Sequence, residues 1–224
     1  MQVLIEFLQA TLVVPLALLP IINPLGGAAL FASITGGSER LARPMARQVA
    51  INVWIILMVA MLIGSYVLEL FGISLPIVRV GGGLLVAATG WRMLHDAGDD
   101  AVRDAVANET AELSAQEIAK RSFFPMSFPL TSGPGSIATS IALGTRFPHS
   151  PTNYILGVIV AAIGAALTAA IVFLCYRYAV RLQKKMGEIG VIVVARLSAF
   201  ILLCIGIEMV WAGWVDLYRA LPAG

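Results

Sequence analysis

The chain has 224 residues, of which 59% are hydrophobic and only 12% are charged, about half the charged share of an ordinary soluble domain. The formal net charge of +2 is too small to indicate a nucleic-acid partner, and no basic run alternates with aromatic residues. This composition excludes an ordinary soluble domain and predicts an integral membrane protein in contact with the lipid bilayer.

Six apolar segments follow one another along the chain. Four contain no Asp, Glu, Lys or Arg and reach the ~20 residues that a spanning helix needs: residues 7–38, 48–68, 122–145 and 147–176. Two more, residues 73–94 and 189–215, each carry an arginine near the start. We therefore predict an all-α integral membrane protein with six transmembrane helices.

The first segment is interrupted by Asn23-Pro24, followed by Gly26 and Gly27. No basic stretch precedes this segment and no cleavage pattern closes it, so a signal peptide is not predicted. Proline lacks a backbone donor and moves the preceding residue out of the α region. The helix is therefore expected to stop near Asn23, close to the middle of the membrane.

The fourth segment contains a second break, at Thr131-Ser132-Gly133-Pro134-Gly135-Ser136. A shift of 110 positions aligns Pro24 with Pro134 and also Pro15 with Pro125. In transporters, Gly/Pro-interrupted segments at corresponding positions of two halves indicate a substrate site at the bilayer midplane. The alternative, that these prolines only kink ordinary membrane helices, stays open at this stage.

An internal duplication gives three spans in each half, and three is an odd number. The second half must then sit upside down relative to the first, which is the inverted-topology repeat. The predicted parts are residues 1–95, a polar linker over 96–117, and residues 118–224. Arg79 and Arg196 align as equivalents at a shift of 117.

A new half-helix begins after each break, and its first N–H groups lack partners within the helix. Helix N-termini favour anions, and neither motif contains Lys or Arg. This combination favours a zwitterion whose carboxylate is held at the breaks and whose side chain is small. The predicted substrate-binding residues are Asn23, Pro24, Gly26, Gly27, Thr131, Ser132, Gly133, Gly135 and Ser136.

Three charged residues fall inside apolar segments. Glu208 lies deep in the last segment, where a carboxylate is costly and therefore a functional candidate; we predict a group that exchanges a proton during transport, or else a group near the outer interface. Arg79 and Arg196 have side chains long enough to reach the interface. For these two arginines a structural role is favoured over contact with substrate.

The distribution of Lys and Arg predicts the orientation. Eleven of them fall in the three loops after the first, third and fifth segments, whereas the other loops and ends hold far fewer. By the positive-inside rule those three loops are cytoplasmic. Both termini are then expected on the outer side of the membrane.

No residue pattern indicates catalysis, a metal or a cofactor. Cys175 and Cys204 lack any metal-ligand spacing, and Ser132 has no His or Lys in another span to act as its base. An acidic cluster at Asp96, Asp99, Asp100 and Asp104 resembles part of a lipid-enzyme metal site but is better interpreted as a solvated loop. A non-enzyme is predicted.

Three motifs resemble those of the MarC family of bacterial inner-membrane proteins, to which the small neutral amino acid transporters called SnatA belong. They are Asn23-Pro24-Leu25-Gly26 with the residues up to Thr35, Pro129-Leu130 leading into Gly133-Pro134-Gly135, and Gly81-Gly82-Gly83-Leu84-Leu85 after Arg79. The resemblance covers the whole chain.

This resemblance implies a secondary transporter of the bacterial cytoplasmic membrane that exports or exchanges small neutral amino acids by alternating access. The alternatives are a passive channel for small solutes or, less favoured, a membrane-embedded enzyme of lipid metabolism. The sequence leaves homo-oligomerisation open.

Overall fold

The computed structural model describes residues 2–95, 115–145 and 151–220. Within these ranges the regular elements are all helical. In chain order they are α1 (Gln2–Ile22), α2 (Pro24–Ile34), α3 (Glu39–Leu70), α4 (Leu75–His95), α6 (Ala115–Arg121), η1 (Ser122–Thr131), α7 (Pro134–Gly144), α8 (Pro151–Arg177) and α9 (Ala179–Arg219). Most of the predicted linker, including its acidic cluster, lies outside the described residues.

Five of these helices are long and apolar enough to cross a membrane: α1, α3, α4, α8 and α9. They correspond to five of the six predicted segments, so the prediction of an all-α membrane protein is confirmed. The remaining predicted segment, residues 122–145, is divided between η1 and α7. With 11 residues, α7 is about 16 Å long, about half the hydrocarbon thickness of a bilayer.

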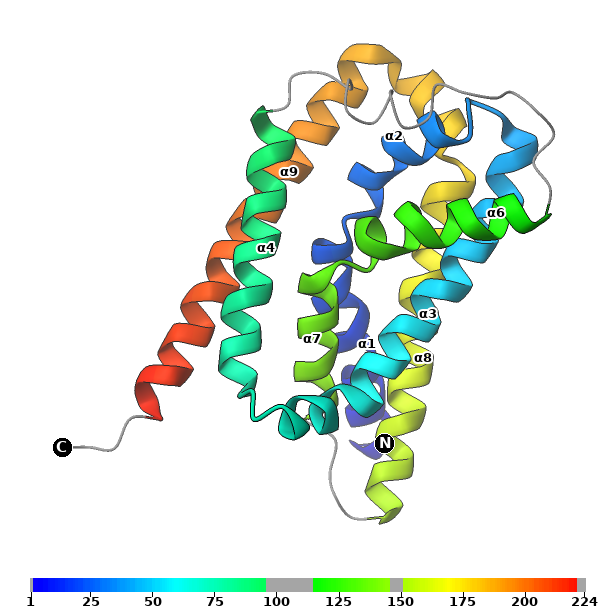
Figure 1. The fold of residues 1–224 in the computed structure, drawn as a ribbon. Coiled ribbons are helices and arrows are strands. Elements are labelled where there is room, and N and C mark those ends of the chain that lie inside the picture. Colours follow the sequence, from blue (N-terminus) through cyan, green and yellow to red (C-terminus); the bar gives the residue numbers. More distant parts are fainter. Residues whose placement is uncertain (1, 96–114, 146–150, 221–224) are drawn as a thin grey trace.

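The long helices run between two ends of the bundle (Figure 1). At the upper end in this view, α3 begins, α4 and α8 end, and α9 begins; α1 begins and α9 ends at the lower end. The α4–α9 pair forms one flank and the α3–α8 pair the other, while α1, α2 and α7 lie between them.

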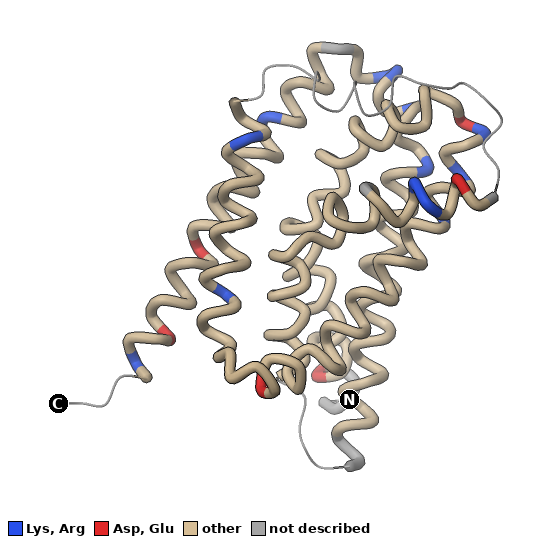
Figure 2. Tube along the Cα trace, viewed as in Figure 1, with Lys and Arg blue, Asp and Glu red and all other residues tan. Residues whose placement is uncertain are grey.

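Most Lys and Arg residues gather at the upper end of the bundle (Figure 2). They come from the start of α3, the end of α4, α6, the end of α8 and the start of α9. We call this the basic end, and the other the opposite end. This separation of charge is the spatial counterpart of the loop pattern in the sequence.

The core is built mainly by α1, α2, α3 and α8, with fully buried Leu18, Phe31, Met45 and Leu57. Many large apolar side chains point outward instead, as Leu16 does with 71% of its surface exposed. A soluble protein does not expose so much apolar area. The outward faces therefore suit contact with lipid chains.

The last helix bends at Gly187, whose φ of 66° and ψ of 175° are not helical. Glycine adopts this backbone conformation without a steric penalty. The bend separates a short segment at the basic end, Ala179 to Met186, from the long descending part that packs on α4. The predicted last span, which begins at Ile189, lies just beyond this bend.

Candidate functional site

The first break occurs at Asn23, between α1 and α2, where the sequence predicts it. Asn23 adopts a left-handed conformation, with φ 48° and ψ 58°, rather than the extended one usual before proline. Its side-chain oxygen accepts a hydrogen bond from the Gly26 N–H at 3.1 Å. A Cβ on Gly26 would lie 2.9 Å from the Asn23 Cγ. The N-terminus of α2 is therefore capped by a residue of the break itself.

The second break is longer than predicted. Instead of one interruption at Pro134, the chain is already irregular through η1, where Phe124 (φ −120°, ψ 125°) and Phe128 (φ −134°, ψ 127°) are extended. Each of these residues precedes a proline, Pro125 or Pro129, and proline disfavours the α conformation at the residue before it. The prediction of helix up to the break is wrong for this reason.

The N-terminus of α7 differs from that of α2 because no side chain caps it. Gly135 and Ser136 at this end are buried, and the Ser136 hydroxyl donates to the Gly133 carbonyl at 2.8 Å. One residue earlier, the buried Ser132 hydroxyl has no hydrogen-bond partner among the described residues. The α7 N-terminus therefore keeps more free hydrogen-bonding groups than the α2 N-terminus, and such groups at a helix N-terminus suit an anion.

The two breaks lie against each other. A Cβ on Gly135 would lie 3.3 Å from the Cγ2 of Ile21, two residues before Asn23, and would overlap the Cγ2 of Val86 on α4. The start of α7 therefore packs directly on the end of α1. The structure thus brings the two predicted motifs together in the interior, although they are more than 100 residues apart in the chain.

Tyr176, near the end of α8, contacts both breaks. Its hydroxyl lies 2.8 Å from the Thr131 hydroxyl oxygen, and a Cβ on Gly27 would lie 2.6 Å from the same Tyr176 oxygen. Its ring stacks on Phe31 of α2, with centroids 4.8 Å apart. Since Thr131 gives its one hydroxyl proton to the Met126 carbonyl, Tyr176 is the donor in their mutual bond.

Tyr176 is not among the residues that the sequence predicts for the site. The sequence shows only an aromatic residue with a hydroxyl group at the end of an apolar span, directly before Arg177. Such a residue needs a hydrogen-bond partner when it is buried, and only the three-dimensional structure shows that the partner belongs to a break.

A second missed feature is a chain of amide and hydroxyl groups between α3 and η1. Gln48 donates to the Asn52 side-chain oxygen at 3.2 Å, and the Asn52 amide donates to the Ser127 hydroxyl oxygen at 3.0 Å. Two amides four residues apart lie on one face of a helix. Two amides at this spacing in a charge-free segment are the sequence feature that could have indicated an interhelical contact, because polar side chains between membrane helices form hydrogen bonds.

The charged residues separate into two groups. Arg79 of α4 forms an ion pair with Asp216 of α9, a partner that the sequence did not suggest. Arg79 and Glu208 both line one cavity of about 370 Å³ between α1, α4, α7 and α9. Arg196 is exposed and does not line it, so the two arginines that align in the sequence occupy different surroundings.

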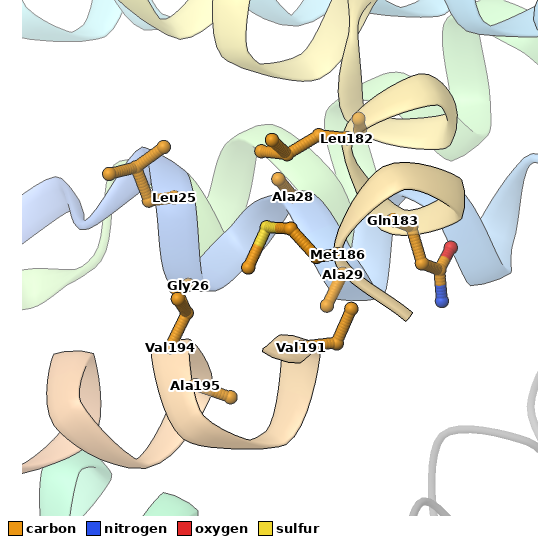
Figure 3. Close-up of a pocket in the computed structure, with 11 residues that line it drawn as sticks. Leu25, Gly26, Ala28, Ala29, Leu182, Gln183, Met186, Val191, Val194 and Ala195 are labelled. Carbon is orange, nitrogen blue, oxygen red and sulfur yellow. The ribbon is translucent and has the colours of Figure 1, made fainter. Parts of the chain in front are cut away.

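A second, smaller cavity of about 20 Å³ lies nearer the basic end (Figure 3). Leu25, Gly26 and neighbouring α2 residues face Leu182, Met186 and Val194 of α9 across it. Its walls are almost entirely apolar. Neither of these two cavities is lined by residues of both breaks. The breaks meet instead through the direct contact of Gly135 with Ile21.

Helices long enough to span a membrane, a largely apolar outer surface and an internal pair of broken helices define a multi-pass integral membrane protein. The chain belongs to the MarC family of integral membrane proteins, whose match covers residues 8–218. The resemblance seen in the motifs is thus confirmed.

Two relatives illustrate the similarity. The chain is 31% identical over 205 residues to the inner membrane protein MarC of Salmonella typhimurium, with 90% of this chain and 92% of that protein covered. It is 32% identical over 207 residues to the protein of the same name from Escherichia coli, with the same coverage. No solved structure matches the chain.

Proposed function

We propose that the protein is a secondary transporter that exports or exchanges small neutral amino acids across the cytoplasmic membrane by alternating access. The observation that carries this proposal is the contact between the two helix breaks, with Gly135 packed on Ile21. Two half-helices that meet inside a membrane protein are typical of transporter substrate sites. Broken backbone is tolerated there only where it is covered by protein or lines a wet cavity.

The α7 N-terminus is the proposed carboxylate site. Its buried N–H groups lack a side-chain cap, and the Ser132 hydroxyl beside them is unpaired within the described chain. The α2 N-terminus has less to offer, because the Asn23 side chain already accepts from Gly26. A carboxylate at α7 would complete hydrogen bonds that this structure leaves open.

The surroundings favour a small and uncharged side chain. Residues 19–31 and 126–140, which include both breaks, contain no Asp, Glu, Lys or Arg. A charged substrate side chain would have no counter-ion there, and burying an unpaired charge is costly. The close approach of Tyr176 to Gly27 and of Val86 to Gly135 also leaves little room.

We further propose that η1 and α7 together make a sixth crossing and that residues 1–95 and 118–224 are inverted repeats. The packing supports this, because α3 lies on α8 and α4 on α9, while α1 contacts α8 and α7 contacts α3. These are the exchanged pairs that a two-fold relation between the halves requires. The names of the relatives favour the inner membrane, and the basic residues at one end of the bundle favour both termini outside.

The test is transport by the purified protein in liposomes loaded with alanine or glycine. We expect saturable efflux that external neutral amino acids accelerate, since an exchanger returns faster when loaded. Efflux no faster than from protein-free liposomes, across several neutral amino acids, would contradict the substrate class. Flux that does not saturate and is not accelerated would instead favour a passive channel.

A further inference from the structure

The cavity between α1, α4, α7 and α9 lies apart from the two breaks. Its volume of about 370 Å³ falls in the range of small-molecule sites. Thr139, the α7 residue that lines it nearest to the break, lies five residues after Pro134, or about 7.5 Å along the helix axis. An amino acid is too short to occupy this cavity and the α7 N-terminus at once.

Glu208 faces this cavity because of its position on α9. Ile205, Glu208, Met209 and Ala212 all line the cavity, at the i, i+3, i+4 and i+7 spacing of one helix face. The neighbouring face of α9 is used differently, since Gly206 and Gly213 pack on the backbone of α4. The carboxylate of Glu208 is therefore directed toward the cavity rather than toward α4.

The charges around the cavity do not balance. Arg79 and Asp216 pair with each other, and nothing in the described parts of the chain forms a hydrogen bond or an ion pair with Glu208. Glu208 is exposed, but it lies within the membrane-spanning part of α9, where an unpaired carboxylate favours a cationic partner. Arg79, in turn, has five N–H donors, and its pairing with Asp216 leaves some of them unused.

We infer that this cavity is a second recognition site for a zwitterion, in which Glu208 accepts hydrogen bonds from a primary ammonium group and Arg79 donates to the acidic group. The small apolar residues Val13, Ala17 and Ala142 on its walls match a small aliphatic side chain. This inference rests on the proposed function for its ligand. The amino acid would then bind in this cavity, between the two breaks and the opposite end of the bundle.

A phospholipid with an ethanolamine headgroup carries the same pair of charges, so the experiment must separate the two sources. Binding of radiolabelled alanine is measured on the full chain in nanodiscs of phosphatidylcholine, which has no primary ammonium group. Competition by alaninamide and N-acetylalanine tests the carboxylate and the ammonium group separately. We expect both analogues to compete at least about tenfold more weakly than alanine.

Glu208→Gln is expected to weaken alanine binding by about tenfold or more and to remove the preference for alanine over N-acetylalanine. Glu208→Asp retains the charge and should keep that preference, which guards against a folding effect. Glu69→Gln, the same change on the exposed end of α3, is the matched control and should leave binding unchanged.

Unchanged affinity in Glu208→Gln, with transport by the unaltered protein intact, would overturn the cavity site and leave the proposed function standing. Absence of any neutral amino acid binding or transport by the unaltered protein would overturn both. Loss of alanine binding on adding phosphatidylethanolamine to the nanodiscs would assign the cavity to a lipid headgroup and overturn the amino acid site.

Discussion

At the scale of single residues, the glycines of the breaks serve close approach. Gly26 and Gly27 both lie within helix α2 and have no positive φ, so neither is required by an unusual backbone. Gly26 leaves space for the Asn23 side chain and Gly27 for the Tyr176 hydroxyl. The lack of a side chain at Gly27 therefore allows α8 to lie close to α2 at the site.

Substitution of Gly27 by alanine is expected to destabilise the protein by about 1–3 kcal/mol, the usual cost of overpacking. The new Cβ would lie 2.6 Å from the Tyr176 oxygen but 3.4 Å from the Tyr176 Cζ. Tyr176→Phe should therefore relieve most of the strain. Free energies of unfolding of both single variants and the double variant, in detergent, measure this coupling.

The expected coupling energy between Gly27→Ala and Tyr176→Phe is about 1 kcal/mol or more in favour of the double variant. Tyr176→Phe alone should cost only about 0.5–1.5 kcal/mol, since Thr131 keeps its bond to the Met126 carbonyl. Strictly additive effects would mean that the hydroxyl does not occupy the space over Gly27.

Ser132→Ala separates binding from folding. The Ser132 hydroxyl has no partner within the described part of the chain, so its removal should leave the free energy of unfolding unchanged or raise it. Substrate affinity should fall by about two- to tenfold, the worth of one hydrogen bond. Ser140→Ala is the control, because that buried hydroxyl already donates to the Ser136 carbonyl. Equal affinity in the two variants would remove Ser132 from the proposed site.

The positions of both breaks could be predicted from the sequence because proline acts on its immediate neighbours. Asn23 and Gly133 end up one residue before the new helices, where the local rule puts them. Tyr176 could not be predicted, since its role depends on α8 packing beside α2 and η1. The same limit applies to Asp216, whose pairing with Arg79 joins residues 137 positions apart.

At the scale of helices, the α4–α9 pair is held at close distance by glycines on both sides. A Cβ on Gly83 would lie 2.7 Å from the Gly206 carbonyl oxygen and 2.8 Å from the Val210 nitrogen. Small residues allow such approach, and close packing is a main source of helix association in lipid. The motif Gly81-Gly82-Gly83 is visible in the sequence, but only the packing of the helices shows that Gly83 meets Gly206.

Gly83→Ala should therefore push α4 and α9 apart and lower the free energy of unfolding by about 1–3 kcal/mol. Gly81→Ala, two residues earlier on the same helix, is the matched control because nothing lies within 4 Å of its Cβ position. Its expected effect is neutral or a gain of about 0.5–1 kcal/mol from helix propensity. Thermal unfolding in detergent, run side by side, gives the comparison; an equal loss in both variants would contradict the close approach at Gly83.

Helix irregularities show where local rules were sufficient and where they were incomplete. The extended conformations of Phe124 and Phe128 follow from the effect of proline on the preceding residue, whereas the apolar composition of the segment favours a spanning helix. The bend at Gly187 carried a weaker signal, a single glycine within a charged stretch. Composition predicts spans well, whereas the path of the chain inside a span depends on individual prolines and glycines.

At the scale of the whole molecule, the two ends of the bundle differ in charge and in the cavity that lies nearer to each. The basic end carries most of the Lys and Arg and the small apolar cavity beside α2. The larger cavity is lined by the end of α7 and the later part of α9, toward the opposite end. If the basic end is cytoplasmic, the larger cavity lies on the outer side of the two breaks.

Reporter fusions test that orientation. Alkaline phosphatase folds only outside the cytoplasmic membrane, so a fusion after Arg219 should be active and one after His95 inactive; a fluorescent protein that folds only in the cytoplasm should give the reverse. The reason is the cluster of basic residues near the ends of α4 and α8, which resists translocation.

Replacing Arg177, Arg181, Lys184 and Lys185 by glutamine should weaken the orientation bias and yield a population with mixed orientation. Phosphatase activity after His95 in the unaltered chain would invert the orientation, and the larger cavity would then open to the cytoplasm as an entry site for export.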